Sequence, residues 1–268
     1  MKNILDLSVI LPIKSSLMKD FEEFFDKAIS SISEQEFLPK SLVIVHTGDE
    51  QLTIFLEKYE FKDLNVELIK FDGEPNFSSQ VNLGIQNSKT KWVSILEVDD
   101  EYSKIWFKNV KKHMDVYTDV DAFLPIVVDV DNKLVFQGFT NEATFAANFS
   151  QEMGYLTNET LLQYQNFQTS GMVFKKSLIE DFGGFKKSMK LTFVYEFLLR
   201  LTYNSAKILT IPKIGYKHIN LREGSIFWEY KNGSNVLTEN EVKFWINSAK
   251  KEYFFTEDRK INYEVENA

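Results

Sequence analysis

The residues best suited to chemistry form an acidic cluster at the end of an apolar run. The run begins at Trp92, and Glu97, Asp99, Asp100 and Glu101 follow within five positions. Its apolar, partly β-branched composition predicts a buried strand, and ligands commonly bind at the carboxyl ends of strands in open α/β sheets. Close carboxylates repel one another, and Mg²⁺ or Mn²⁺ compensates this repulsion because both ions prefer oxygen ligands. The cluster therefore indicates a divalent-cation site, with a solvated acidic turn as the alternative.

The segments before the cluster alternate between strand-like and helix-like patterns. Buried strands are predicted at 7–13, 41–45 and 66–71, and amphipathic helices at 17–32 and about 50–60. Pro12 cannot donate a hydrogen bond to a neighbouring strand, so we expect the first strand to end there. Pro39 is expected to close the connection to the second strand. The β-α-β-α-β order predicts a parallel sheet with right-handed crossovers, which is the α/β class.

A polar helix start precedes the acidic strand. Ser78 or Ser79 is expected to cap a helix that runs to about Ser88, and Asn76 and Asn82 lie close to its apolar positions. Asn is a mediocre helix former, so these amides indicate a polar partner near the helix start. Ordinary capping with a solvated helix face is the alternative.

The composition fits one large α/β domain, or one domain with an appendage. The chain has 268 residues, 44% of them hydrophobic, and contains no Cys, which excludes a disulfide framework, a thiol nucleophile and a Cys-ligated zinc site. The net charge of −8 argues against a general nucleic-acid binder. The chain lacks a run of roughly 18 apolar residues, so no transmembrane helix is predicted. Its N-terminus lacks the apolar core of a signal peptide, and we therefore expect a cytoplasmic protein.

The order of these motifs resembles the family 2 glycosyltransferases, which have the GT-A fold. The resemblance covers about residues 7–220, and its pieces are the strand ending at Pro12, the helix after it, the loop at Gly48, Asn82-x-Gly84-Ile85 and Glu97-x-Asp99-Asp100. It implies a Rossmann-like, mostly parallel sheet flanked by helices, with a mixed C-terminal half and a C-terminal helix. It also implies an inverting, metal-dependent transferase of nucleotide-activated sugars.

The resemblance implies residues for both the donor and the metal. Mn²⁺ or Mg²⁺ is expected on Asp99 or Asp100, with Glu97 reaching a ribose hydroxyl or the metal's waters. His46 replaces the acid that usually holds the nucleotide base, and it can hydrogen-bond a base edge or ribose. A partly buried structural His is the alternative. The implied nucleotide-sugar contacts are Pro12, His46, Gly48, Asp49, Asn76, Asn82, Glu97, Val98, Asp99 and Arg222.

The end of the family's core also has a counterpart. Tyr216-x-His218 matches an aromatic-x-His segment that precedes a flexible loop in the family. The match implies that His218 ligates the metal or touches the diphosphate, and that Arg222 closes over phosphate. A structural role for His218 is the alternative.

The middle of the chain predicts a mixed arrangement. Residues 122–128 and 134–136 predict a hairpin, in which Asp129 and Asp131 fit a solvated turn better than a second metal site. Residues 138–166 have no clear period, which is typical of a functional loop region that here would shape an acceptor pocket. Further strands are predicted at 168–174 and, as a pair, at 206–218.

The family's catalytic base has no obvious counterpart. In the family, Gly-Gly-Phe is followed by a helix that starts with Glu-Asp, and the Asp is the base; here the aligned pair is Phe193-Val194. Glu196 is the first candidate to replace it. A helical wheel puts Glu196 about 130° from the apolar face that contains Val194, and its i,i+4 spacing to Arg200 favours a surface ion pair. Asp181, beside Gly183-Gly184, is the fallback candidate.

Residues 1–220 are expected to form the glycosyltransferase-like domain, and 221–268 a loop and helical extension packed on it. Thr238-x-x-Glu241 is a capping box, and Trp245 and Ala249 follow on one apolar stripe. Packing on the core is the expected role of the stripe, with a homodimer contact or a peripheral membrane contact as alternatives.

The sequence supports two functional hypotheses. The first is an inverting, metal-dependent glycosyltransferase that acts on a glycan or another hydroxyl acceptor, as in polysaccharide biosynthesis. The second is a catalytically weakened GT-A domain that binds a sugar nucleotide or glycan, or scaffolds a partner. The residue at position 194, where the family has its catalytic Asp, separates these two hypotheses. A nucleotidyltransferase is a weaker third interpretation, because no Gly-rich phosphate loop with Arg or Lys follows the first strand.

Overall fold

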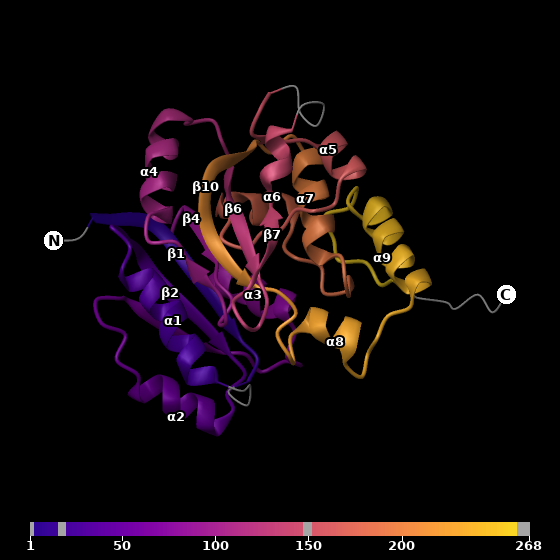
Figure 1. Ribbon diagram of the computed structural model, residues 1–268. Helices are drawn as coiled ribbons and strands as arrows, with labels where there is room; N and C mark the ends of the chain where they lie inside the picture. The colour runs from indigo at the N-terminus through magenta and orange to yellow at the C-terminus, as the bar shows by residue number, and fades with distance from the viewer. Residues whose placement is uncertain (1–2, 16–19, 147–151, 262–268) are drawn as a thin grey trace.

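The computed structural model describes residues 3–15, 20–146 and 152–261 (Figure 1). Leu17, where a helix was expected to begin, lies outside these residues. Up to the acidic cluster the chain forms β1 (Asn3–Ile13), α1 (Phe21–Ser33), β2 (Phe37–His46), α2 (Glu50–Lys58), β3 (Val66–Lys70), α3 (Phe77–Asn87) and β4 (Trp92–Ile95). It continues with β5 (Glu101–Tyr102), α4 (Trp106–Val116), β6 (Ala122–Val130), β7 (Phe136–Thr140), a 3₁₀ turn (Glu142–Phe145), β8 (Tyr155–Leu156), α5 (Asn158–Gln163), β9 (Val173–Lys175), α6 (Ser177–Phe182), α7 (Phe193–Tyr203), β10 (Ile208–Ile219), α8 (Ile226–Asn232) and α9 (Glu239–Glu252).

The described strands form one mixed sheet. Its order is β3-β2-β1-β4-β9-β6-β10-β5, with β7 beside β6 and β8 beside β10. The neighbours from β3 to β4 are all parallel, so the predicted α/β class and the parallel first half are confirmed. The chain moves outward from β1 to β3 and then returns to the other side of β1 as β4. Ligands of open α/β sheets bind at the carboxyl ends of strands at such a reversal.

The second half of the sheet is mixed, as predicted. β9 is antiparallel to both β4 and β6, and it therefore joins the parallel half to a second block in which β6 and β10 are parallel. β5, β7 and β8 add to this block in antiparallel fashion. The β6–β7 pair is the predicted hairpin.

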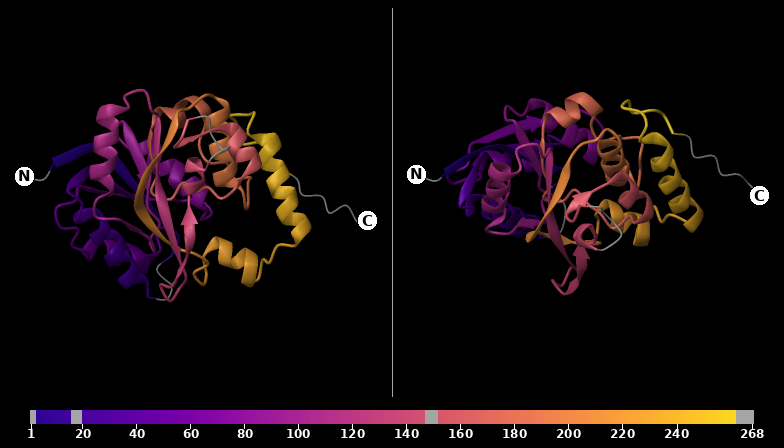
Figure 2. Two further views of the ribbon diagram at one scale, coloured as in Figure 1. Left: turned by 45° about the horizontal axis from the view of Figure 1, so that its top comes forward. Right: turned by 90° about the horizontal axis from the view of Figure 1, so that it is seen from above.

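Apolar cores fill both faces of the sheet. Successive side chains of a strand point to opposite faces, so Ile10 of β1 joins one core and Val9 the other. The first core includes side chains of α3, α7 and α9, and the second includes side chains of α1 and α4. Figure 2 shows α9, in yellow, far from the indigo α1 layer. Within the described ranges, none of the helices combines the length and apolar character that crossing a bilayer requires.

Three strand predictions differ from the structure, and two of them involve proline. Pro39 lies inside β2, because the pairing of β1 with β2 is irregular just after this position and such irregularities tolerate a residue without an N–H. The strand pair predicted at 206–218 is the single strand β10. Its pairing with β6 shifts register after Thr210, where Pro212 lies. The strand predicted at 168–174 is also shorter, since β9 begins at Val173.

A buried ion cluster lies beneath α7. Glu196 and Arg200 are both fully buried, and the Arg200 guanidinium donates to the two Glu196 carboxylate oxygens at 2.9 and 3.0 Å. The ammonium group of Lys186 lies 3.0 Å from the same carboxylate. The cluster therefore holds one anion between two cations, and both of its carboxylate oxygens are occupied.

The surface ion pair expected for Glu196 is thus wrong. The wheel places Glu196 opposite the apolar face, but two other segments cover that side of α7. The Arg200 guanidinium donates to the carbonyls of the turn after α6, at Phe182, Gly183 and Gly184. The Lys186 ammonium donates to carbonyls of the chain after α9, at Glu252 and Phe255. The cluster therefore fixes α7 against both segments, which a wheel for one helix cannot predict.

We expect Glu196→Gln to lower the free energy of unfolding by about 3–5 kcal/mol, because removing one partner leaves buried charge uncompensated. Asp115→Asn is the matched control: Asp115 pairs with Lys111 at the same i,i+4 spacing on an exposed helix face, where such pairs contribute little. Urea denaturation followed by circular dichroism measures both variants. Equal, small effects would contradict a structural role for the buried cluster.

Candidate active site

Three side chains with metal-binding atoms meet beside the end of β4. Ligand atoms of Glu97, Asp100 and His218 all lie within 4.8 Å of one another. The two acids follow β4, whereas His218 lies on β10. They meet because the residues directly after the acids form β5, and β5 pairs with β10. The predicted acidic cluster therefore lies at a strand end, and its third member comes from the other half of the sheet.

Groups of β10 hold Asp100 and the loop around it. One oxygen of the fully buried Asp100 accepts the backbone N–H of Ile219 at 2.9 Å, and the other lies 3.0 Å from His218 Nδ1. The Tyr216 hydroxyl accepts the backbone N–H of Glu97 at 3.1 Å. Tyr216 and His218 are two positions apart on one strand, so both side chains point to the face that carries the acids.

Asp99 has a different partner from its neighbour. The Arg222 guanidinium donates to Asp99 at 2.5 Å. The sequence offered Asp99 or Asp100 as the metal ligand; the structure groups Asp100 with Glu97 and His218, and pairs Asp99 with Arg222. Val98, between the acids, is buried in the core. Arg222, expected to close over phosphate, thus lies directly at the acidic cluster.

The charges of the cluster are strongly coupled. Burial and the neighbouring Asp100 raise the pKa of Glu97 to about 8, although His218 and Arg222 oppose this. Burial and Asp100 likewise raise the pKa of Asp99, against the effect of Arg222. Burial alone would lower the pKa of His218, but Asp100, Glu97 and Asp129 together raise it to about 10. Without a metal ion, the cluster therefore retains protons near neutral pH.

The end of β2 carries a neutral histidine. Burial, followed by the positive charge of Lys70, lowers the pKa of His46. His46 Nδ1 accepts the N–H of Gly48 at 3.2 Å, which leaves the ring proton on Nε2. Gly48 has φ +72°, a conformation that favours glycine. Asp49 caps α2 by accepting the N–H of Leu52 at 2.9 Å.

Three other residues assigned to the donor have structural contacts. Pro12 pairs with Val45 near the end of β1. Asn76, rather than Ser78 or Ser79, caps α3 by accepting the N–H of Ser79 at 3.1 Å. Asn82 holds the main chain of Phe185 from both sides, donating to its carbonyl at 2.8 Å and accepting its N–H at 2.9 Å. The polar partner expected for this helix is therefore, at Asn82, the turn after α6.

The expected base position is apolar. Val194 is half-buried in the first turn of α7 and packs against the core. Glu196, two residues further along α7, is fully buried in its ion cluster. Asp181 is exposed on α6, and α6 follows the end of β9, where Lys175 pairs with Trp92 at the start of β4. Asp181 is therefore at the opposite end of β4 from the acidic cluster.

Asp129 is a residue that the sequence interpretation missed. It was assigned to a solvated turn, but it lies in β6 and pairs with His218 of β10. Asp131 does form the turn, where it accepts the N–H groups of Lys133 and Val135 at 2.8 and 2.9 Å. Asp129 and Asp131 differ in whether the strand includes them. The apolar run alone predicts that the strand ends at Val128, before both residues.

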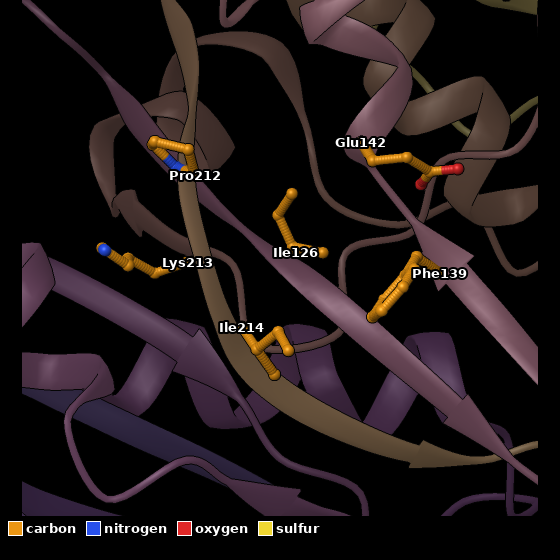
Figure 3. A pocket seen from close by; sticks show the side chains of 6 residues that line it. All are labelled: Ile126, Phe139, Glu142, Pro212, Lys213 and Ile214. Atoms are coloured by element: carbon orange, nitrogen blue, oxygen red, sulfur yellow. The ribbon is translucent and has the colours of Figure 1, made fainter. Parts of the chain in front are cut away.

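A shallow cavity of about 240 Å³ lies apart from the acids, between β6, β7 and β10 (Figure 3). Ile126 lines it, and because Ile126 neighbours Val127 along β6, its side chain points to the face opposite the acidic cluster. Phe139 and Glu142 come from the segment expected to shape an acceptor pocket. The remaining lining residues are Pro212, Lys213 and Ile214.

Comparison with known proteins agrees with this fold. The chain matches the model of a family described as Glycosyl transferase family 2 over residues 8–183. This chain belongs to glycosyl transferase family 2. A Haemophilus influenzae protein described as an uncharacterized glycosyltransferase is 23% identical over 112 residues, which are 40% of this chain and 35% of that protein.

The solved structures it resembles confirm the GT-A-like fold. S. aureus TarS 1–349 has a TM-score of 0.60 and 20% identity, over 82% of this chain and 60% of that one. The same protein in complex with UDP-GlcNAc has a TM-score of 0.61 and 19% identity, over 85% of this chain and 61% of that one. This chain thus spans about three fifths of those TarS chains.

We predict that the metal-free protein loses stability as pH rises. The folded pKa values of Glu97, about 8, and His218, about 10, exceed the ordinary values of 4.5 and 6.5. The folded state therefore binds more protons than the unfolded state, so this contribution is complete below the unfolded pKa values and is lost through the folded ones. Thermal midpoints in EDTA should be higher at about pH 6 than at about pH 9. Glu97→Gln should reduce the difference between the thermal midpoints at the two pH values. The prediction would be contradicted if the midpoint of the parent rose with pH and that of Glu97→Gln did not.

Proposed function

We propose that this glycosyltransferase is an inverting enzyme that moves a sugar from a nucleoside-diphosphate donor to a hydroxyl acceptor such as a glycan, with Mn²⁺ or Mg²⁺ bound. The observation that carries the proposal is the convergence of Glu97, Asp100 and His218 at the carboxyl end of β4. Family membership supports it. The TarS complexes with UDP and UDP-GlcNAc make uridine nucleotides the first donors to test.

The three converging residues fit a divalent cation. Two carboxylates and an imidazole supply the oxygen and nitrogen ligands that Mn²⁺ accepts. Burial, followed by the negative charge of Asp100, raises the pKa of Glu97, and a bound cation would offset both effects. We infer that Glu97, Asp100 and His218 hold the ion. When bound, the ion neutralises charge that develops on the leaving diphosphate. Arg222 is the adjacent side chain that can bind phosphate oxygens in bidentate fashion.

The proposed transfer also requires a proton acceptor. The acceptor oxygen attacks the anomeric carbon, and the bond from that carbon to the diphosphate breaks, so the electron pair leaves with the diphosphate. The acceptor's proton must go to a base, which typically contributes about 10²–10⁴-fold. Val194 cannot accept a proton. We therefore propose that the activity is weak or restricted to a narrow range of acceptors.

The second candidate function is a weakened family member that binds a sugar nucleotide or glycan, or scaffolds a partner. A specific observation favours it: the carboxylate nearest to Val194 in the helix, that of Glu196, is buried, and both of its oxygens are occupied by Arg200 and Lys186. In this reading the acidic cluster still binds the metal and the nucleotide, but the sugar is not transferred.

The metal site is tested by thermal stabilisation. We expect a nucleoside diphosphate with Mn²⁺ to raise the melting temperature of the parent, because a ligand that binds only the folded state stabilises it. Asp99→Asn combined with Asp100→Asn should abolish this shift. Glu101→Gln should keep it, since Glu101 pairs with Lys217 outside the three-ligand group. A double variant that binds nucleotide and metal as the parent does would rule out the acidic cluster as the metal site.

The base is tested by four enzymes assayed in parallel for sugar transfer and donor hydrolysis: the parent, Val194→Asp, Glu196→Gln and Asp181→Asn. We expect Val194→Asp to raise activity by about 10²-fold or more, within the usual range for a general base. Glu196→Gln, assayed well below its melting temperature, should leave the activity per folded molecule unchanged. Loss of a clear parental activity in Glu196→Gln would identify Glu196 as the base, and loss in Asp181→Asn would identify Asp181.

A further inference from the structure

A hydrogen-bonded network of neutral side chains surrounds the carboxylate of Asp129. The Thr140 hydroxyl donates to one Asp129 oxygen at 2.9 Å, and the Gln168 amide donates to the other at 3.3 Å. The same amide contacts the Thr140 hydroxyl. The Ser170 hydroxyl donates to the Gln168 side-chain oxygen at 3.0 Å. Residues from β6, β7 and the segment before β9 thus fix the orientation of one carboxylate.

The strand register places this carboxylate beside the proposed metal ligands. Val127 of β6 pairs with Tyr216 of β10, and Asp129 pairs with His218, with no irregularity between the two pairs. Paired residues of parallel strands share a face, as do residues two positions apart. Val127 and Tyr216 pack in the same core, so Asp129 and His218 continue that face. Neighbouring strands are about 5 Å apart, and the two side chains are therefore close neighbours.

The network has the chemistry that binds sugar hydroxyls. Each hydroxyl of a sugar is both a donor and an acceptor, and a carboxylate with a neighbouring amide and hydroxyl satisfies both capacities. A carboxylate is a poor partner for a phosphate group, because both groups are acidic. Asp129 is only half-buried, and each of its oxygens has a further lone pair beyond the bond from Thr140 or Gln168. It can therefore accept a hydrogen bond from a ligand without losing the bonds that orient it.

We propose that Asp129, oriented by Thr140 and Gln168, binds hydroxyl groups of the donor's sugar and thereby determines which sugar the site accepts. The inference rests on the proposed function, because it takes the nucleoside-diphosphate sugar as the ligand. In such a donor the sugar is bonded directly to the distal phosphate. Its hydroxyls consequently lie within a few Å of any residue next to the groups that bind this phosphate, and Asp129 is such a residue.

The test is a binding measurement with Asp129→Asn, which keeps the size of the side chain and an oxygen for the Thr140 hydroxyl. Isothermal titration with Mn²⁺ would compare UDP, UDP-GlcNAc, UDP-glucose and UDP-galactose, with GDP, CDP and ADP as alternatives should UDP not bind. The parent should discriminate among the sugar conjugates. Asp129→Asn should bind the free diphosphate within about twofold of the parent. It should lose about tenfold or more in affinity for the preferred conjugate, as expected for a hydrogen bond to a charged group.

Asp131→Asn is the matched control, because Asp131 is two residues away and forms only the hairpin turn. It should bind every ligand as the parent does. Gln168→Ala, which releases one Asp129 oxygen, should weaken conjugate binding while leaving binding of the free diphosphate unchanged.

The outcomes of these measurements distinguish a failure of this inference from a failure of the proposed function. A parent that binds no nucleoside diphosphate with Mn²⁺ would refute both. A parent that binds the diphosphate while Asp129→Asn keeps the parental selectivity would refute the sugar site alone. Unchanged donor selectivity with loss of sugar transfer would assign the network to the acceptor instead, which also contradicts the inference.

Discussion

Burying several carboxylates at the end of β4 requires compensating positive charge, and the rest of the structure is arranged to supply it. Asp100 is fully buried and contacts His218, while Asp99 contacts Arg222. Both cationic residues come from β10 and the loop after it. The sheet therefore must bring the last strand of the core next to the loop after β4, and β5 achieves this by pairing with β10 immediately beyond the acids. The mixed second half of the sheet therefore supplies the positive charge that the acids of the first half require.

Local sequence patterns were sufficient to predict the parallel half of the sheet. Each strand of the parallel half is a short apolar run, and its alternation with helices requires parallel crossovers, so residues up to the acidic cluster could be assigned from the sequence. The meeting of Glu97 with His218 could not be derived in this way, because it depends on which strands pair across the sheet. The family resemblance supplied His218 as a candidate. In the structure, the ligand atoms that lie together are those of Glu97, Asp100 and His218, and Asp99 is outside this group.

The errors have a common physical origin, which is contact with a segment far along the chain. Glu196 lies on the polar side of an isolated α7, yet Lys186 and the segment after α9 cover that side. Asp129 follows an apolar run and resembles a turn residue, yet pairing with β10 extends the strand through it. For Asn82, whose donor contact stays a prediction, the structure adds a partner far along the chain, since its amide holds the main chain of Phe185. In each case the residue type was informative, and the partner was not local.

The pairing of Arg222 with Asp99 means that the site carries an internal counter-ion. Because Asp99 lies outside the group of Glu97, Asp100 and His218, this counter-ion does not have to leave before a cation binds those three side chains. The Arg222 guanidinium donates through Nε to Asp99 and through one terminal nitrogen to the Glu223 carbonyl, and its other N–H donors can be given to phosphate oxygens. Under the proposed function, a phosphate group would therefore bind beside the metal ion while Arg222 still pairs with Asp99.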